Sequence, residues 1–197
     1  LGTNHVYILK ETGEIVDNCQ KRPQRLFEER ELSVDECAGY LQKAISLLKS
    51  QTAASGSSEG SLKVIITVSP IRYAKYGYHG SQLSKATLLL AADKLVKENP
   101  GVVSYFPAYE IMNDELRDYR FYKEDMLHPS EQAVEYIWEL FRATYFGKAA
   151  ELFLEDWRPI REALGHKPFH PESEEHQKFI ARTEEKKRQF EEKYHLL

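Results

Sequence analysis

This chain of 197 residues has few cysteines, no long apolar run and only a small excess of negative charge. Its two cysteines, Cys19 and Cys37, are too few for a disulfide framework and form no Cys-x-x-Cys pair, so we expect reduced thiols and a cytoplasmic location. No apolar run approaches the roughly 20 residues that cross a bilayer, which predicts no membrane span. The net charge of −4 gives no broad attraction to nucleic acid, so nucleic acid is not an expected partner.

What the chain does contain is an alternation of strand and helix patterns. Its 42% hydrophobic and 29% charged residues are values typical of an ordered globular protein. Strands are predicted at residues 5–9, 62–68 and 102–106, and helices at residues 33–50, 83–98 and 130–146. Because connections of helical length join parallel strands, we expect an α/β fold with three layers, α/β/α, in which these strands are parallel neighbours in one sheet.

Local signals mark the helix starts and the domain organisation. Ser33-Val34-Asp35-Glu36 is a capping box, in which the serine oxygen and the glutamate serve free backbone N–H groups, and Ser130 is a second cap. Residues 52–61 lack core-forming side chains, which predicts a flexible surface loop. We expect an α/β domain over residues 1–146 and a helical extension packed on it over residues 147–197.

The strongest indication of chemistry is Asp125-Met126-Leu127-His128. An acid three residues before a histidine can accept a hydrogen bond from one ring nitrogen and fix the tautomer. The other ring nitrogen is then free to take a proton from a serine hydroxyl as a general base. The spacing alone is also that of an ordinary pair of surface neighbours, so both interpretations stay open.

Several other polar residues fall at the carboxyl ends of the predicted strands, where the active groups of parallel α/β folds gather. Asn4 is either an oxyanion donor or the cap of a strand-end turn. Ser69 lies in the Ser69–Arg72 turn, but no sharp glycine elbow surrounds it, so the end of a strand is an alternative to a nucleophile or substrate contact. Arg72 either binds an anionic group or is solvated, and Asn18 either contacts substrate or holds a turn.

His166 and His170 are four residues apart, a spacing that would suit a zinc ion only on a helix. Pro168 lies between them and opposes a helix. We therefore expect no metal site and no cofactor.

Seven blocks of the chain, taken together and in this order, resemble the C-terminal part of the bacterial GSCFA-domain family, itself a relative of the SGNH (GDSL-like) hydrolases. The likeness covers nearly the whole chain. At residue 20 the chain has Gln where the likeness predicts His. The blocks are Gly2-Thr3-Asn4, Asn18-Cys19-Gln20-Lys21, residues 64–72, residues 105–111, Asp125–His128, Tyr136-Ile137-Trp138 and residues 167–173.

The resemblance implies a parallel, flavodoxin-like sheet and a serine nucleophile from the Gly-Ser-Cys-Phe-Ala block that names the family. No such string occurs in these 197 residues. Leu1-Gly2-Thr3 looks like the end of the third core strand, so we expect the nucleophile on an N-terminal segment of the same protein that precedes Leu1. That segment is an expected partner of the chain.

The function implied by the resemblance is that of a serine-dependent ester hydrolase or acyltransferase. His128 is the expected general base, Asp125 its orienting partner, and Asn4, in a Gly-x-Asn pattern, an oxyanion donor. The wider superfamily suggests acyl or acetyl esters as substrates, including those of carbohydrates. The alternative is a non-catalytic domain of the same fold that binds a ligand or a partner. A Gly-Ser-Cys-type block upstream would favour the enzyme.

Overall fold

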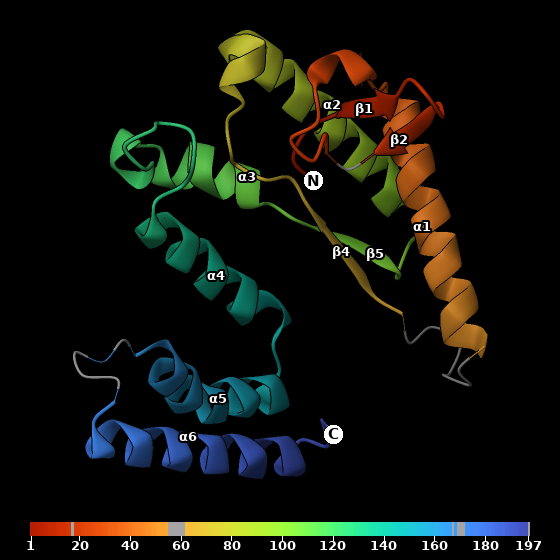
Figure 1. The fold of residues 1–197 in the computed structure, drawn as a ribbon. Helices are drawn as coiled ribbons and strands as arrows, with labels where there is room; N and C mark the ends of the chain where they lie inside the picture. The colour runs from red at the N-terminus through yellow and green to blue at the C-terminus, as the bar shows by residue number, and fades with distance from the viewer. Residues whose placement is uncertain (17, 55–61, 167, 169–171, 197) are drawn as a thin grey trace. The chain divides into compact units, whose positions relative to one another are not determined.

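The computed structural model describes residues 1–16, 18–54, 62–166, 168 and 172–196 (Figure 1). The chain forms two compact units, Leu1–Glu139 and Leu140–Leu197. The division falls within helix α4, Glu131–Tyr145. The expectation of a domain boundary after residue 146 stays a prediction. Across the described parts of the chain, no helix combines the length and the apolar character needed to cross a membrane.

The first unit contains a pair of parallel strands, as predicted. Strand β4, Val64–Thr67, lies beside β5, Val103–Phe106, with Val64 opposite Val103 and Thr67 opposite Phe106. Helix α2, Gly77–Glu98, forms the crossover between them and starts earlier than the expected residue 83. The chain turns back at Asn99, whose carbonyl oxygen accepts a hydrogen bond from the Val103 N–H (3.0 Å).

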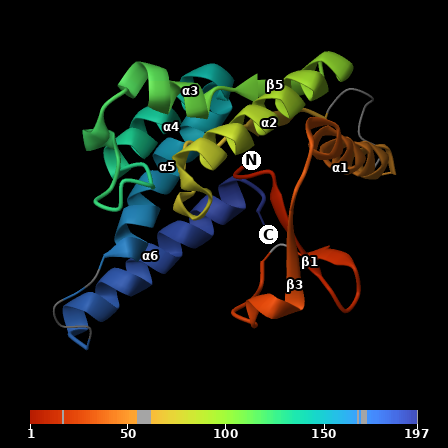
Figure 2. The same cartoon turned by 90° about the horizontal axis from the view of Figure 1, so that it is seen from above.

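The remaining strands correct the sequence-based fold. Strand β1, His5–Leu9, was expected to be a parallel neighbour of β4, but it is the centre of a separate antiparallel sheet with the order β2-β1-β3 (Figure 2). Its partners are β2, Glu14–Val16, and β3, Phe27–Glu31. The link from Leu9 to Glu14 is too short for a parallel crossover, and Gly13 (φ 72°) supplies the tight turn.

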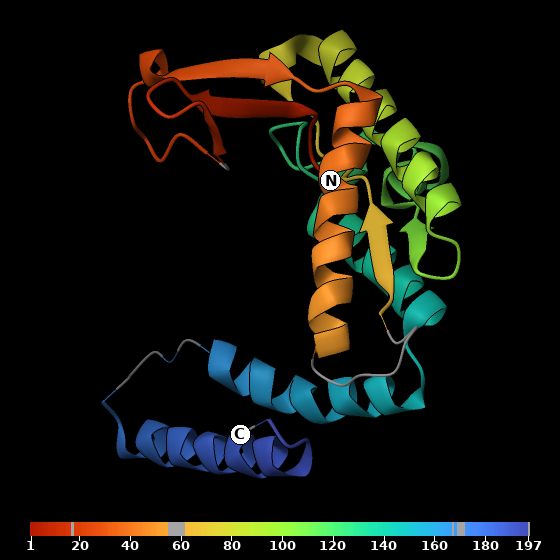
Figure 3. The same cartoon turned by 90° about the vertical axis from the view of Figure 1, so that its right-hand side faces the viewer.

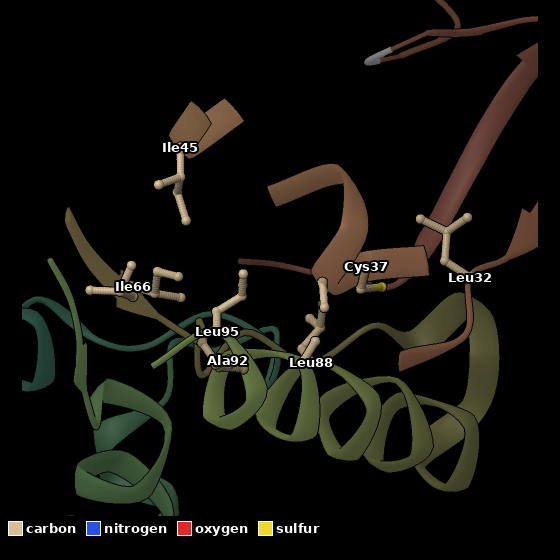
Figure 4. Close-up of a cluster of buried hydrophobic side chains, with 11 residues drawn as sticks. Leu32, Cys37, Ile45, Ile66, Leu88, Ala92 and Leu95 are labelled. Carbon is tan, nitrogen blue, oxygen red and sulfur yellow. The ribbon is translucent and has the colours of Figure 1, made fainter. Parts of the chain in front are cut away.

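The main core lies between α1, α2 and the parallel strands. Helix α1, Val34–Ala54, starts at the predicted capping box: the Glu36 N–H donates to Ser33 Oγ (3.3 Å), and the Ser33 N–H donates to Glu36 Oε2 (2.9 Å). It runs through residues 52–54, which were expected to be loop; residues 55–61 lie outside the described residues. Figures 3 and 4 show α1 and α2 side by side with β4, and the buried side chains are Leu32, Cys37, Ala38, Ile45, Ile66, Val68, Leu88, Ala91, Ala92, Leu95 and Val103.

Leu1 lies along the end of β4. Its amine donates to the Thr67 carbonyl oxygen (2.6 Å), and its own carbonyl oxygen accepts from the Ser69 N–H (2.8 Å). These two hydrogen bonds flank Val68 in the manner of a parallel neighbouring strand. Residues 1–3 are not assigned to a strand, so the expectation that Leu1-Gly2-Thr3 is the end of a core strand stays a prediction.

Short helical segments follow β5 and lead to α4. They are α3 (Ala108–Glu110), the π-helix η3 (Ile111–Leu116) and the 3₁₀ helix η4 (Tyr119–Phe121). A second buried cluster, Met112, Phe121, Tyr122 and Ala133, holds them to the start of α4. The predicted cap of α4 is confirmed, because the Ala133 N–H donates to Ser130 Oγ (3.3 Å).

The second unit is helical. Helix α5, Lys148–Gly165, and helix α6, Glu174–Lys193, pack side by side. Their contact is aromatic, with the Phe153 and Phe190 ring centroids 4.8 Å apart. An ion pair from Lys193 Nζ to Asp156 Oδ2 (2.6 Å) adds to this contact.

Candidate functional site

The Asp125–His128 sequence forms a closed loop between η4 and α4. The Lys123 N–H donates to the His128 carbonyl oxygen (2.8 Å), and Tyr122 forms an isolated antiparallel bridge with Pro129. Within the loop, Met126 has a left-handed backbone (φ 59°). The loop is thus held by its own main chain, which fixes the directions of the Asp125 and His128 side chains.

Both oxygens of the Asp125 carboxylate are used. Oδ1 accepts hydrogen bonds from the backbone N–H groups of Leu127 (2.9 Å) and His128 (3.0 Å), which is an Asx turn. Oδ2 lies 2.6 Å from Nδ1 of the His128 ring. These contacts, first the backbone hydrogen bond from His128, lower the pKa of Asp125 to about 2.

The ionised Asp125 determines the tautomer of His128. Because a carboxylate only accepts hydrogen bonds, Nδ1 must carry the proton, and Nε2 of the neutral ring has a free lone pair. Nε2 has no hydrogen bond or ion pair to the described residues, and the His128 side chain is 53% exposed. The predicted contact between Asp125 and one ring nitrogen of His128 is therefore present, and the role of His128 as a general base stays a prediction.

Arg72 lies against the same loop. Its backbone N–H donates to the Leu127 carbonyl oxygen (3.1 Å), and its guanidinium Nη1 lies 3.4 Å from the Met126 carbonyl oxygen. The turn after β4 that delivers it is held in part by Ser69, whose Oγ accepts from the Ile71 N–H (3.3 Å). The structure thus brings together two of the segments that were expected to share one site.

Tyrosine rings surround the Arg72 guanidinium. Its Cζ lies 3.9 Å from the ring centroid of Tyr122, 5.5 Å from that of Tyr119 and 6.0 Å from that of Tyr78. The distance to Tyr122 is that of close stacking. The aromatic surroundings were not predicted, because Tyr119 and Tyr122 are far from Arg72 in the sequence.

Two cavities share Arg72 and Tyr119. A cavity of about 190 Å³ is lined by Arg72, Met112, Asn113, Arg117, Asp118, Tyr119 and Tyr122. A cavity of about 380 Å³ is lined by Arg72, Tyr78, Ser81, Gln82, Tyr119 and Met126. Met126 of the His128 loop lines the larger cavity, and Arg72, whose backbone is bonded to that loop, lines both.

Asn4 is buried, with 4% of its surface exposed. Its Nδ2 donates to the Leu32 carbonyl oxygen (2.8 Å), and its backbone N–H donates to Ser84 Oγ (3.0 Å). Its Oδ1 has no partner among the described residues. These contacts fit the alternative in which Asn4 holds a strand-end turn, and no described contact joins it to His128; its role as oxyanion donor stays a prediction.

Asn18 forms a turn of its own. Its Oδ1 accepts from the Gln20 N–H (2.7 Å), and Gln20 has a left-handed backbone (φ 46°). A contact of Asn18 or of Ser69 with substrate stays a prediction.

Lys85 was missed by the sequence analysis. It lies in the middle of α2 with 2% of its surface exposed, and its Nζ donates to the Gly2 carbonyl oxygen (2.5 Å). Burial lowers the pKa of Lys85 to about 8. Its position on the same helical face as Ser81, Leu88 and Ala92 was the available signal.

Metal ligands do not cluster in the parts of the chain that the structure describes, where no group of three or more His, Cys, Asp or Glu side chains is placed to hold an ion. His170 lies outside the described residues, so its spacing to His166 stays untested.

Comparison with known proteins gives the family. No curated protein and no solved structure matches the chain. A model described as the C-terminal domain of GSCFA domain proteins matches residues 157–197. The model of the GSCFA family itself matches residues 1–141, well over half of the chain. The likeness inferred from the separate sequence blocks is therefore confirmed, and the chain belongs to the GSCFA family.

Proposed function

We propose that this chain supplies the general base of a serine-dependent ester hydrolase or acyltransferase with the three-layer SGNH arrangement. The observation that carries the proposal is the Asp125–His128 pair, in which Oδ2 and Nδ1 lie 2.6 Å apart in a histidine side chain that is half exposed. The parallel pair β4–β5, whose strands are joined by helix α2, supports this arrangement. The Leu1 hydrogen bonds beside β4 support a further parallel strand on that side.

In the proposed reaction, Nε2 of His128 takes the proton of a serine hydroxyl as its oxygen attacks the ester carbonyl carbon. The ionised Asp125 stabilises the imidazolium that forms. His128 then returns this proton to the departing alcohol oxygen as the carbon–oxygen bond breaks. Water, or an acceptor alcohol in a transferase, attacks the acyl-serine in the second half, with His128 again as base.

The nucleophile is proposed to be the serine of a Gly-Ser-Cys-type block outside residues 1–197. Within the described residues, no serine hydroxyl is hydrogen-bonded to His128. Ser69 Oγ instead accepts the Ile71 N–H (3.3 Å). The same observation favours the second candidate function, a binding domain of this fold without catalysis, so the experiment must separate the two.

The test is hydrolysis of short-chain acyl esters by the full-length natural protein. His128→Ala should lower kcat by about a thousandfold or more, because removing any one member of a catalytic triad abolishes most of its activity. His79→Ala is the matched control, since His79 is also exposed and lies in the first turn of α2. Circular dichroism should be the same for all variants.

Asp125→Asn is a sharper variant. The asparagine Oδ1 still accepts the backbone N–H groups of Leu127 and His128, so the loop keeps its form. Its NH₂ group cannot accept from Nδ1–H, so the ring is driven to the wrong tautomer, and kcat should fall about a hundredfold to ten-thousandfold. Unchanged turnover in both variants would remove the pair from catalysis. A full-length protein that binds esters without hydrolysing them would favour the binding domain.

A further inference from the structure

The lining of the cavity of about 190 Å³ contains two arginines and one acid, so its formal charge is positive. The arginines are Arg72 and Arg117. Within the described part of the chain neither forms an ion pair. The one acid in the lining, Asp118, is the N-cap of η4: its Oδ1 accepts the Arg120 backbone N–H (2.8 Å), and its charge offsets one of the two arginines.

Arg72 is held in place by groups that do not neutralise it. Its guanidinium lies 3.9 Å from the Tyr122 ring centroid, and one nitrogen lies 3.4 Å from the Met126 carbonyl oxygen. The Tyr122 ring is itself buried, and its hydroxyl lies 3.5 Å from Asn113 Oδ1. A guanidinium has five N–H donors in a planar fork, so most of them stay available to a ligand.

Arg117 reaches the cavity from the end of the π-helix η3. Its left-handed backbone (φ 48°) and its N–H bond to the Met112 carbonyl oxygen (3.2 Å) set its direction. Two guanidinium groups with open donors around a small cavity match a compact oxyanion, because a carboxylate or phosphate accepts paired, charge-assisted hydrogen bonds.

We propose that the substrate carries a carboxylate or phosphate group close to the ester, and that Arg72 and Arg117 bind this oxyanion. The proposal rests on the function proposed above, and it adds the charge class of the substrate. The Arg72 backbone is bonded to Leu127, the residue before His128, so the proposed anion site and the proposed base are linked through one loop. The larger cavity of about 380 Å³, which Arg72 also lines together with Tyr78 and Tyr119, has room for the remainder of the substrate.

The first test measures binding without catalysis. Inorganic phosphate is titrated calorimetrically into the full-length protein at low ionic strength. Arg72→Gln and Arg117→Gln should each raise its Kd about tenfold or more, because each removes a charged hydrogen bond. Arg72→Lys should raise it less, since it keeps the charge but loses the planar fork.

Arg120→Gln is the matched control. It makes the same change in net charge two residues from Asp118, but Arg120 does not line the cavity and lies over the Phe121 ring (4.8 Å). Its Kd for phosphate should stay within about twofold of the wild-type value. An equal effect of Arg120→Gln, or no effect of the two cavity variants, overturns the anion site.

The second test uses matched aryl esters whose acyl group ends in methyl, in carboxylate or in phosphate. The wild-type kcat/KM should be higher for one of the charged esters than for the neutral one. That ratio should fall about tenfold in Arg72→Gln and Arg117→Gln but not in Arg120→Gln. The carboxylate and phosphate arms show which oxyanion is preferred.

The two proposals fail separately. His128-dependent hydrolysis with no charge preference and no arginine effect overturns the anionic substrate and leaves the hydrolase. Phosphate binding that depends on Arg72 and Arg117, in a protein that hydrolyses none of the esters, supports the anion site and overturns the hydrolase.

Discussion

Replacing Lys85 by methionine should change the way that stability depends on pH. Lys85 is almost fully buried, and its Nζ has one hydrogen bond, to the Gly2 carbonyl oxygen. Its pKa falls from 10.5 to about 8 because burial disfavours the ammonium form. A fall of this size corresponds to a folded-state cost of about 3 kcal/mol when the group is charged.

Because the pKa of Lys85 is lower in the folded state than in the unfolded state, stability should rise with pH. Below about pH 8 the lysine is charged in both states, and the folded state carries the full cost of the buried charge. As the pH rises from about 8 to about 10.5, the folded state loses its proton before the unfolded state does, and that cost disappears. Stability of the wild-type protein should therefore rise over this window relative to Lys85→Met.

The assay is urea denaturation followed by circular dichroism at a series of pH values. The free energy of unfolding of wild type minus that of Lys85→Met should increase by about 2–3 kcal/mol between about pH 7 and about pH 10. The lost bond to the Gly2 carbonyl oxygen adds a constant offset, so it does not alter the slope. Tyr73, whose ring lies 5.1 Å from Nζ, keeps its proton longer because burial raises its pKa. A difference that stays flat with pH would refute the reasoning.

Two further substitutions test the core and Asn4. Leu95→Ala, at a fully buried position of α2, should lower the free energy of unfolding by about 3–5 kcal/mol, whereas Leu90→Ala on the exposed face of the same helix should change it by less than about 0.5 kcal/mol; equal effects in urea denaturation would contradict the packing. Asn4→Ala should cost about 1–3 kcal/mol, because it leaves the Leu32 carbonyl oxygen without its side-chain donor. If kcat for esters falls at least tenfold in the folded Asn4→Ala protein, Asn4 also serves as an oxyanion donor.

The parallel pair and its helices were predictable because their signals are local. An apolar strand, a helical period and the Ser33 capping box are each recognised from residues that are close together in the sequence. The partner of β1 was not predictable in this way. Strand periodicity shows that a segment is extended but not what it pairs with, and β3, Phe-Glu-Glu-Arg-Glu, has the charge pattern of an exposed helix.

In the candidate site, too, local contacts were predictable from the sequence and long-range contacts were not. The Asp125–His128 contact spans three residues, so its geometry followed from the spacing alone. The environment of Arg72 did not, since Tyr119 and Tyr122 reach it across about fifty residues of sequence. Folding, rather than spacing, creates the cavity that the arginine lines.

The bond between the Arg72 N–H and the Leu127 carbonyl oxygen has a consequence for substitutions at position 72. The main chain at position 72 braces the loop that carries His128, and any residue except proline can make that bond. The side chain at position 72 lines both cavities and adds a longer contact to the loop, from Nη1 to the Met126 carbonyl oxygen (3.4 Å). A substitution at position 72 can therefore change the lining of both cavities while the main-chain bond to the loop is kept, because the lining and the bond depend on different atoms of the same residue.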